Sequence, residues 1–164
     1  MTLLAGIIVA MTTSANGLDG VTPAVPVVRP SAVAFPLSDV RLLGGPLKHS
    51  QDVAAGYLLS LEPDRLLARY RQEAGLEKKA ENYPGWEEKE LPGVGLGFYL
   101  SGCSKLFATT QDARFRERVD YILAELEACQ KANGNGYLLA TKDGKKLFAE
   151  IEAGNIRWEG GWML

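Results

Sequence analysis

The stretch "TTQDARFRERVDYILAELEACQKANG", residues 109–134, decides the fold class of the chain. Apolar side chains recur in it at every third or fourth position, which is the spacing that places them on one face of an α-helix. This predicted apolar face consists of Phe115, Val119, Ile122, Leu126 and Cys129. The stretch therefore predicts one long amphipathic helix.

Both ends of this helix carry residues that are typical of helix caps. Thr109 or Thr110 is expected to cap the N-terminus, because a threonine hydroxyl can accept a hydrogen bond from the first turn. Asp112 and Arg116 are four positions apart and predict an ion pair on the helix surface. Gly134 predicts the C-terminal end, since glycine readily adopts the left-handed conformation found there.

Two shorter helices are predicted earlier in the chain. The first covers residues 51–60 behind the cap residue Ser50, and its apolar face holds Val53, Tyr57 and Leu61. The second opens at Pro63, which a first helical turn tolerates, and ends at Gly75. Its apolar side holds Leu66, Leu67 and Tyr70.

The rest of the chain reads as loops, turns and one further helix. Residues 77–93 are polar and interrupted by proline and glycine, so they predict a long loop, and residues 133–137 predict a turn. A last short helix is predicted within residues 143–154, and no stretch alternates like a strand. The predicted class is all-α, built from helical hairpins.

The stretch "LPGVGLGFYLSG", residues 91–102, places glycines at alternate positions before an apolar run. A dinucleotide-binding loop needs G-x-G-x-x-G after a hydrophobic strand, and a P-loop needs Gly-Lys-Ser/Thr; the stretch has neither pattern. The favoured interpretation is a helix entrance at which glycines let backbones pass closely. The residues predicted to enter the core behind it are Phe98, Leu100, Cys103, Leu106 and Phe107.

Composition and charge exclude several classes of function. The net charge is −2, with 18 Lys and Arg against 20 Asp and Glu, so no basic excess points to nucleic acid. One histidine, His49, and two distant cysteines argue against a self-contained metal site. Cys103 and Cys129 are interpreted as helical packing residues, and a disulfide between them stays open.

The first 34 residues differ in character from the rest of the chain. Residues 1–15 hold a short apolar run and a small-residue zone ending at Ala15, as in a signal peptide, although a positive start is missing. The run is too short to span a bilayer, and an unstructured apolar N-terminus is the alternative. Residues 16–34 predict a proline-rich linker or arm, and residues 35–164 the folded domain. Secretion or a periplasmic location is expected.

Two further groups of residues contain side chains that take part in catalysis in other enzymes. Glu87, Glu88 and Glu90 could form a carboxylate pair for glycoside hydrolysis, but three acids in a polar loop are more typical of solvated charge. Ser101 and His49 do not amount to a triad, since any chain of this size contains such residues.

The order of short motifs from residue 35 onward resembles a known family. The motifs are "FPLSDVRLLGGPLKHSQD", "YLLSLEPDRLLARYRQEAGL", "YPGWE", "GFYLSG", "YILAELEACQKANGNGYL" and a terminal "GGW". Together they resemble the N-terminal part of glycoside hydrolase family 127, whose characterised members are β-L-arabinofuranosidases. The resemblance implies the first part of an (α/α)6 barrel. It also implies retaining hydrolysis by a cysteine nucleophile at a zinc site made of cysteines and a glutamate, with a second glutamate as general acid.

Few functional residues of the family have a matching position in this chain. It implies sugar contacts for Gln51 and Trp86, and the alternatives are a helix-start amide and a packing tryptophan. Neither cysteine matches a zinc-ligand position, so no catalytic residue and no metal or cofactor is expected in the chain itself. Val94 and Phe98 stand where the family pattern has two histidines one helical turn apart.

The leading expectation is an N-terminal fragment of a family 127-type glycosidase, inactive alone because the groups for catalysis are missing. A non-catalytic helical module that binds a carbohydrate or a protein is the alternative, as is one half of a split glycosidase. The expected partners are arabinose-containing or other plant glycans and a second copy bound through an exposed half-barrel face. Neither nucleic acid nor a membrane span is expected.

Overall fold

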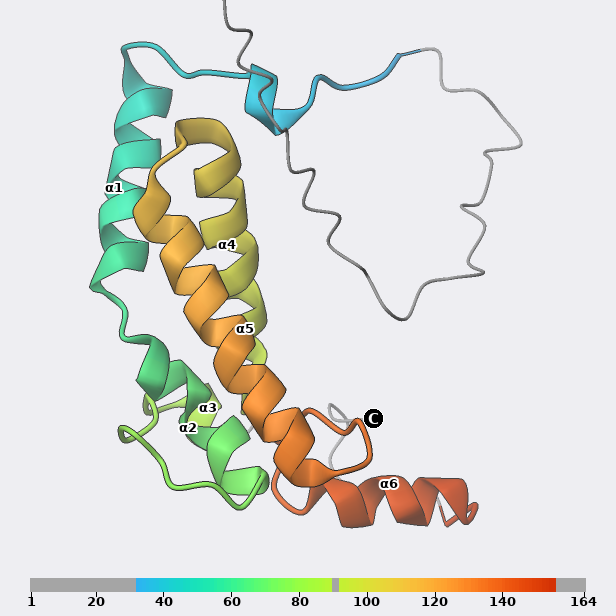
Figure 1. Cartoon of the computed structure of the whole chain (residues 1–164). Coiled ribbons are helices and arrows are strands. Elements are labelled where there is room, and N and C mark those ends of the chain that lie inside the picture. The colour runs from blue at the N-terminus through green and yellow to red at the C-terminus, as the bar shows by residue number, and fades with distance from the viewer. Residues whose placement is uncertain (1–31, 90–91, 156–164) are drawn as a thin grey trace, which may run out of the picture. The chain divides into compact units, whose positions relative to one another are not determined.

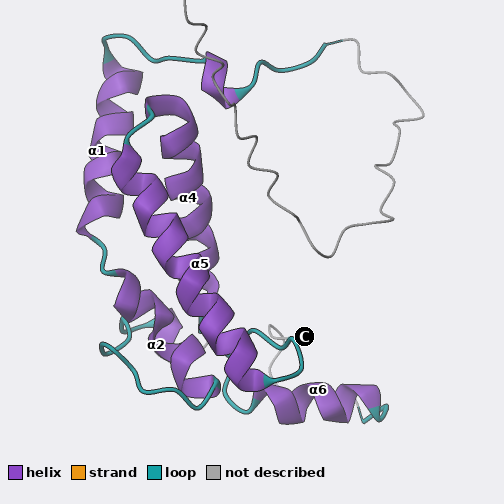
Figure 2. Cartoon of the chain, in the orientation of Figure 1, coloured by secondary structure: helices purple, strands orange, loops and turns teal. Residues whose placement is uncertain are grey.

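The computed structural model describes residues 32–89 and 92–155, and every regular element in these ranges is helical (Figure 2). The predicted signal peptide, residues 1–15, and the linker up to residue 31 lie outside the described residues. The elements are η1 (Leu37–Asp39), α1 (Pro46–Ser60), α2 (Pro63–Glu73), α3 (Trp86–Lys89), α4 (Val94–Thr110), α5 (Ala113–Asn133) and α6 (Gly144–Glu152). The predicted all-α class is confirmed, and it is consistent with part of an (α/α)6 barrel.

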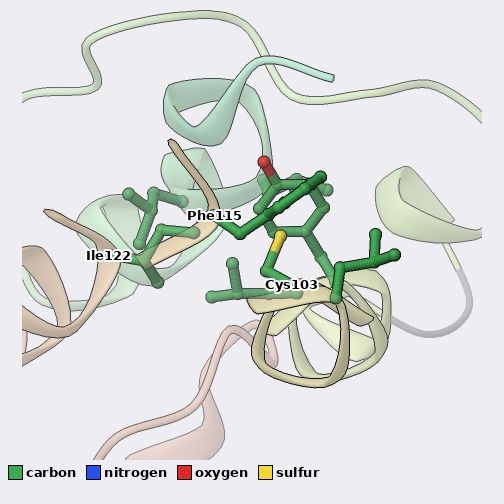
Figure 3. Close-up of a cluster of buried hydrophobic side chains, with 8 residues drawn as sticks. Cys103, Phe115 and Ile122 are labelled. Atoms are coloured by element: carbon green, nitrogen blue, oxygen red, sulfur yellow. The ribbon is translucent and has the colours of Figure 1, made fainter. Parts of the chain in front are cut away.

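Helices α4 and α5 form an antiparallel hairpin whose facing sides make the core (Figure 1). Cys103 from α4 meets Phe115 and Ile122 from α5 in a cluster of buried side chains (Figure 3). The other buried members of the cluster are Leu66, Leu67, Leu96, Tyr99 and Leu106. Because Ile122 is fully buried, its truncation to alanine would cost about 3 kcal/mol of stability.

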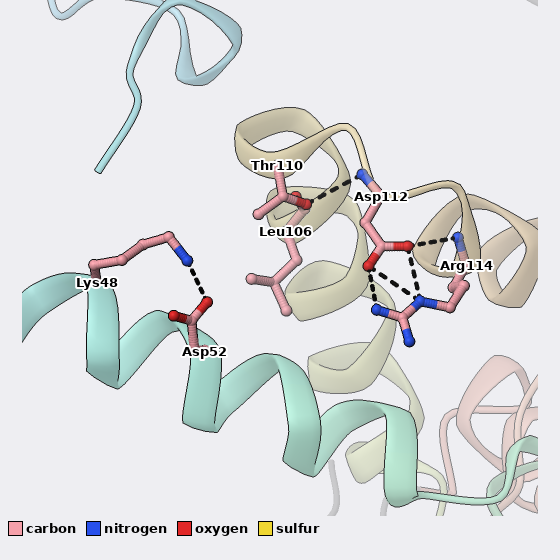
Figure 4. A network of polar contacts seen from close by, with 6 residues as sticks. All are labelled: Lys48, Asp52, Leu106, Thr110, Asp112 and Arg114. Carbon is pink, nitrogen blue, oxygen red and sulfur yellow. Dashed lines mark hydrogen bonds and ion pairs between the residues drawn. The ribbon is translucent and has the colours of Figure 1, made fainter. Parts of the chain in front are cut away.

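The turn between α4 and α5 corrects the predicted cap. Thr109 and Thr110 are the last residues of α4, and Asp112 caps α5, its carboxylate accepting a hydrogen bond from the Arg114 N–H at 3.1 Å. Asp112 also pairs with the Arg114 guanidinium at 2.6 Å (Figure 4) and not with Arg116 as predicted. The prediction was wrong because Asp112 has extended backbone dihedrals, so the four-residue helical spacing does not apply to it.

Helix α1 begins five residues earlier than predicted. Gly45, with φ of +107°, precedes it, and Pro46 occupies the first turn, where a missing N–H costs nothing. Ser50 therefore lies inside the helix and is not its cap.

The apolar face predicted for α1 is also wrong in part. Val53 and Tyr57 are 58% and 62% exposed. The side that packs against the core is carried by Leu58 and Leu59, together with Leu61 just after the helix. Helix α1 thus has large apolar side chains on two sides, one packed and one open.

Helix α2 follows its prediction closely. Pro63 opens it, and Gly75, with φ of +73°, directly follows its C-cap. Leu66 and Leu67 are buried and Tyr70 is half-buried, as expected. The predicted loop 77–93 contains one unpredicted turn of helix, α3, and the predicted last helix is confirmed as α6.

Arg118 of α5 connects three helices through hydrogen bonds. Its guanidinium donates to the carbonyl oxygens of Leu59 at 3.1 Å and Leu61 at 2.6 Å, and to the Tyr99 hydroxyl at 3.2 Å. These carbonyls end α1, where the helix dipole favours a positive charge. In the described part of the chain no helix is both long and apolar enough to cross a membrane.

Candidate functional site

The glycine-rich entrance of α4 is held by two side chains from outside the helix. The Glu87 carboxylate accepts hydrogen bonds from the N–H of Gly93 at 2.7 Å and of Gly95 at 2.5 Å. Tyr70 donates its hydroxyl to the Gly93 carbonyl at 3.1 Å. Burial, with a smaller effect of the nearby Glu87 charge, raises the pKa of Tyr70, which keeps this hydroxyl a donor. Glu87 thus caps α4 from the neighbouring helical turn α3.

Glycine is required at Gly93, which has a φ of +87°, and a side chain at Gly95 would displace the Glu87 carboxylate. A Cβ on Gly93 would lie 2.7 Å from the Ala140 Cβ and 2.8 Å from the Tyr70 Oη, and one on Gly95 would lie 2.4 Å from a Glu87 oxygen. The predicted helix entrance is therefore confirmed, and its N–H groups are already occupied by a carboxylate that would repel a phosphate. The interpretation of Glu87 as solvated charge is wrong, whereas Glu88 is exposed and Glu90 lies outside the described residues.

One side of α4 faces outward beyond this entrance. Phe98 is 75% exposed and Val94 is 43% exposed, so the prediction that Phe98 enters the core is wrong. The other residues predicted for the core are buried, as Cys103 and Leu106 are, or half-buried, as Leu100 and Phe107 are. The apolar run of α4 covers more than one face, and Phe98 falls on the open one.

The structure places Gln51, one of the two predicted sugar contacts, away from Phe98 and Val94. Gln51 is half-buried, and its Nε2 donates to the Thr109 hydroxyl at 3.3 Å. Thr109 follows Phe98 by eleven residues on α4, which is about 16 Å along the axis. Trp86 begins α3, but its side chain lies outside the described part of the structure.

A comparison with protein-family models places these elements in a known family. The model described as β-L-arabinofuranosidase, GH127 catalytic domain, matches residues 39–164. The chain belongs to this family. No curated protein matches the chain.

The two thiols of this family 127 chain do not fit a zinc-bound nucleophile. Cys103 and Cys129 are both free and have no exposed surface. The pKa of each thiol is raised, mainly by burial, which favours the neutral thiol over the nucleophilic thiolate. Within the described ranges no three His, Cys, Asp or Glu side chains are grouped so that they could hold a metal.

A charged cluster that the sequence did not reveal joins α2 and the loop after it to α5 of the family 127 chain. The Glu125 carboxylate pairs with Arg71 at 2.5 Å and with Lys79 at 2.7 Å. Burial opposes ionisation of Glu125, but these two cations outweigh it and lower its pKa. No pattern in the sequence signals this cluster, because its members are 46 and 54 residues apart. Its role is to fix the loop on the hairpin.

Proposed function

We propose that the chain forms a helical portion of a glycoside hydrolase catalytic domain that acts on β-L-arabinofuranosides. The observation that carries this proposal is the family match over residues 39–164, which covers nearly all of the described helices. Arabinose-containing or other plant glycans are the corresponding substrates.

The exposed apolar side chains of α1 and α4 support a place within a larger helical barrel. The two helices contact one another, and a Cβ on Gly102 of α4 would lie 2.8 Å from the Leu58 side chain of α1. Val53 and Tyr57 on α1 and Phe98 on α4 nevertheless remain largely exposed. Each helix of an (α/α)6 barrel packs against neighbours on more than one side, so these side chains are suited to contact further helices.

We further propose that the 164-residue chain does not hydrolyse arabinosides on its own. The family resemblance implies a cysteine nucleophile held at zinc, which keeps its sulfur deprotonated. The sequence contains two cysteines, and both are packed inside the helical core. A nucleophile of that kind would have to come from outside this chain, as in the complete domain or in a split enzyme.

The test is an activity assay with a chromogenic β-L-arabinofuranoside and added zinc. The purified chain is expected to release no chromophore above the level of its C103S/C129S variant. Release by the chain that the double variant lacks would overturn the proposed inactivity.

A sugar-binding module without catalysis is the second candidate function. The observation that favours it is the exposed ring of Phe98, because an aromatic face can stack on a sugar ring. Saturable calorimetric binding of an arabinose oligosaccharide, lost in Phe98→Ala and retained in Tyr121→Phe, would favour the module. If no such binding is detected, the place of the chain in a catalytic domain stays the supported function.

Export of the chain and self-association remain proposals of their own. The apolar run of residues 1–15 supports secretion or a periplasmic location, and N-terminal sequencing after expression in an exporting host would test a cut after Ala15. The exposed side chains of α1 and α4 support association with a second copy.

A further inference from the structure

The end of α5 and the turn after it contain two Asn-Gly dipeptides in succession, Asn133-Gly134 and Asn135-Gly136. In such a dipeptide the backbone nitrogen of glycine can attack the side-chain carbonyl carbon of asparagine, since glycine has no side chain to hinder the approach. The chemistry open to both dipeptides is the same, but the structure holds them differently.

Asn133 is protected at both reacting groups. It is the last residue of α5 and is half-buried. The N–H of Gly134 donates to the carbonyl oxygens of Gln130 at 3.2 Å and Lys131 at 3.1 Å. The Asn133 Nδ2 donates to the carbonyl oxygen of Tyr137 at 3.0 Å. Both the attacking nitrogen and the leaving nitrogen would have to break hydrogen bonds before they could react.

Asn135 has the opposite surroundings. Its side chain is exposed, and no acceptor for the Gly136 N–H is found within the described residues. The Asn135 Oδ1 accepts a hydrogen bond from the Tyr137 N–H at 3.2 Å. A hydrogen bond donated to this oxygen makes the side-chain carbonyl carbon more electrophilic.

We propose that Asn135 is a site of spontaneous deamidation and that Asn133 is spared in the folded protein. The Gly136 nitrogen forms a bond to the Asn135 Cγ and gives up its proton, and the side-chain nitrogen leaves as ammonia. Water then adds to either carbonyl of the resulting five-membered succinimide and opens it to aspartate or isoaspartate. No oxidant, reductant or metal takes part.

The product changes the connection between α5 and α6. A neutral amide becomes a carboxylate, and isoaspartate adds one carbon to the backbone path. Tyr137, which closes the turn, packs edge-to-face on Phe148 of α6 with ring centroids 5.8 Å apart. A longer backbone at position 135 therefore alters the segment that holds α6 to the end of α5.

The experiment is incubation of the intact folded chain at mildly alkaline pH, followed by peptide mapping with mass spectrometry. Conversion is expected at Asn135 at least about tenfold faster than at Asn133, the ratio that the loss of one or two hydrogen bonds gives. In urea the two sites are expected to convert at similar rates, because both are then free Asn-Gly dipeptides. The Asn135→Gln variant should remove the fast conversion and leave the slow one.

Equal rates in the folded chain, or faster conversion at Asn133, would overturn the proposal. So would an unchanged Asn135 over a period in which the urea-unfolded chain converts.

Discussion

Replacing Glu87 by alanine is expected to loosen the entrance of α4. The carboxylate accepts from the N–H groups of Gly93 and Gly95, and Gly93 is buried, so its N–H cannot readily turn to water. Loss of a helix cap costs about 1 kcal/mol, and loss of a negative charge at a helix N-terminus adds about 0.5 to 1 kcal/mol. The expected loss for Glu87→Ala is therefore about 2 kcal/mol. Glu87→Gln keeps one acceptor oxygen, and its expected loss is about 1 kcal/mol.

Urea unfolding followed by circular dichroism measures this loss as a shift of the midpoint to lower urea, by about 1 M for Glu87→Ala. Glu88→Ala is the matched control, because that neighbouring side chain is exposed and its change should stay within about 0.5 kcal/mol. Equal midpoints for the two alanine variants would refute the reasoning that the loop carboxylate holds the helix.

Four further perturbations test other contacts. Arg118→Ala removes three hydrogen bonds and should lower the free energy of unfolding by about 3 kcal/mol, and Arg118→Lys should lower it by about half as much. Equal melting temperatures for the wild type and these two variants would count against the contact. Because its pKa is lowered in the fold, the Glu125 carboxylate stabilises the protein at pH values above 4.5, the ordinary pKa of this group, and the contribution is lost as the pH falls through the lowered pKa. The wild type should therefore lose more stability on acidification than Glu125→Gln. Burial raises the pKa of Tyr99 from 10.0 to about 12, so stability should fall as the pH rises from 10 to about 12. Urea unfolding at a series of pH values should show a smaller fall for Tyr99→Phe. The double variant Val53→Glu/Phe98→Glu should sediment as a smaller species than wild type, and a wild-type chain that is monomeric at every concentration would contradict the proposed self-association.

The sequence predicted the helices well where a local rule determines them. Gly75 and Gly134 end helices in the left-handed conformation, as their positions indicated, and the apolar spacing of residues 115–129 identified the buried face of α5. The start of α1 was missed because Ser50 matches the common pattern of a serine cap, whereas Gly45 and Pro46, which do begin the helix, are a less specific signal.

The errors at the site arose from contacts between distant parts of the chain. Phe98 has the same apolar character as the buried side chains of α4, and only the positions of the other elements that pack on α4 decide which face is covered. The role of Glu87 depends on how the loop folds back over the helix entrance, which no spacing rule encodes. Sequence patterns identified the family better than they placed a single side chain.

The α4–α5 hairpin also has a kinetic consequence. Its two helices are separated by only Gln111 and Asp112, so the contacts between them near the turn are short in sequence, and the two helices supply six of the eight buried side chains of the core cluster. Such contacts form fast, because closing a short loop loses little chain entropy. We expect the hairpin to be the folding nucleus, onto which α1 and α2 condense although they precede it in the chain. Truncations at Ile122 would then slow folding, whereas truncations at Leu58 would mainly speed unfolding.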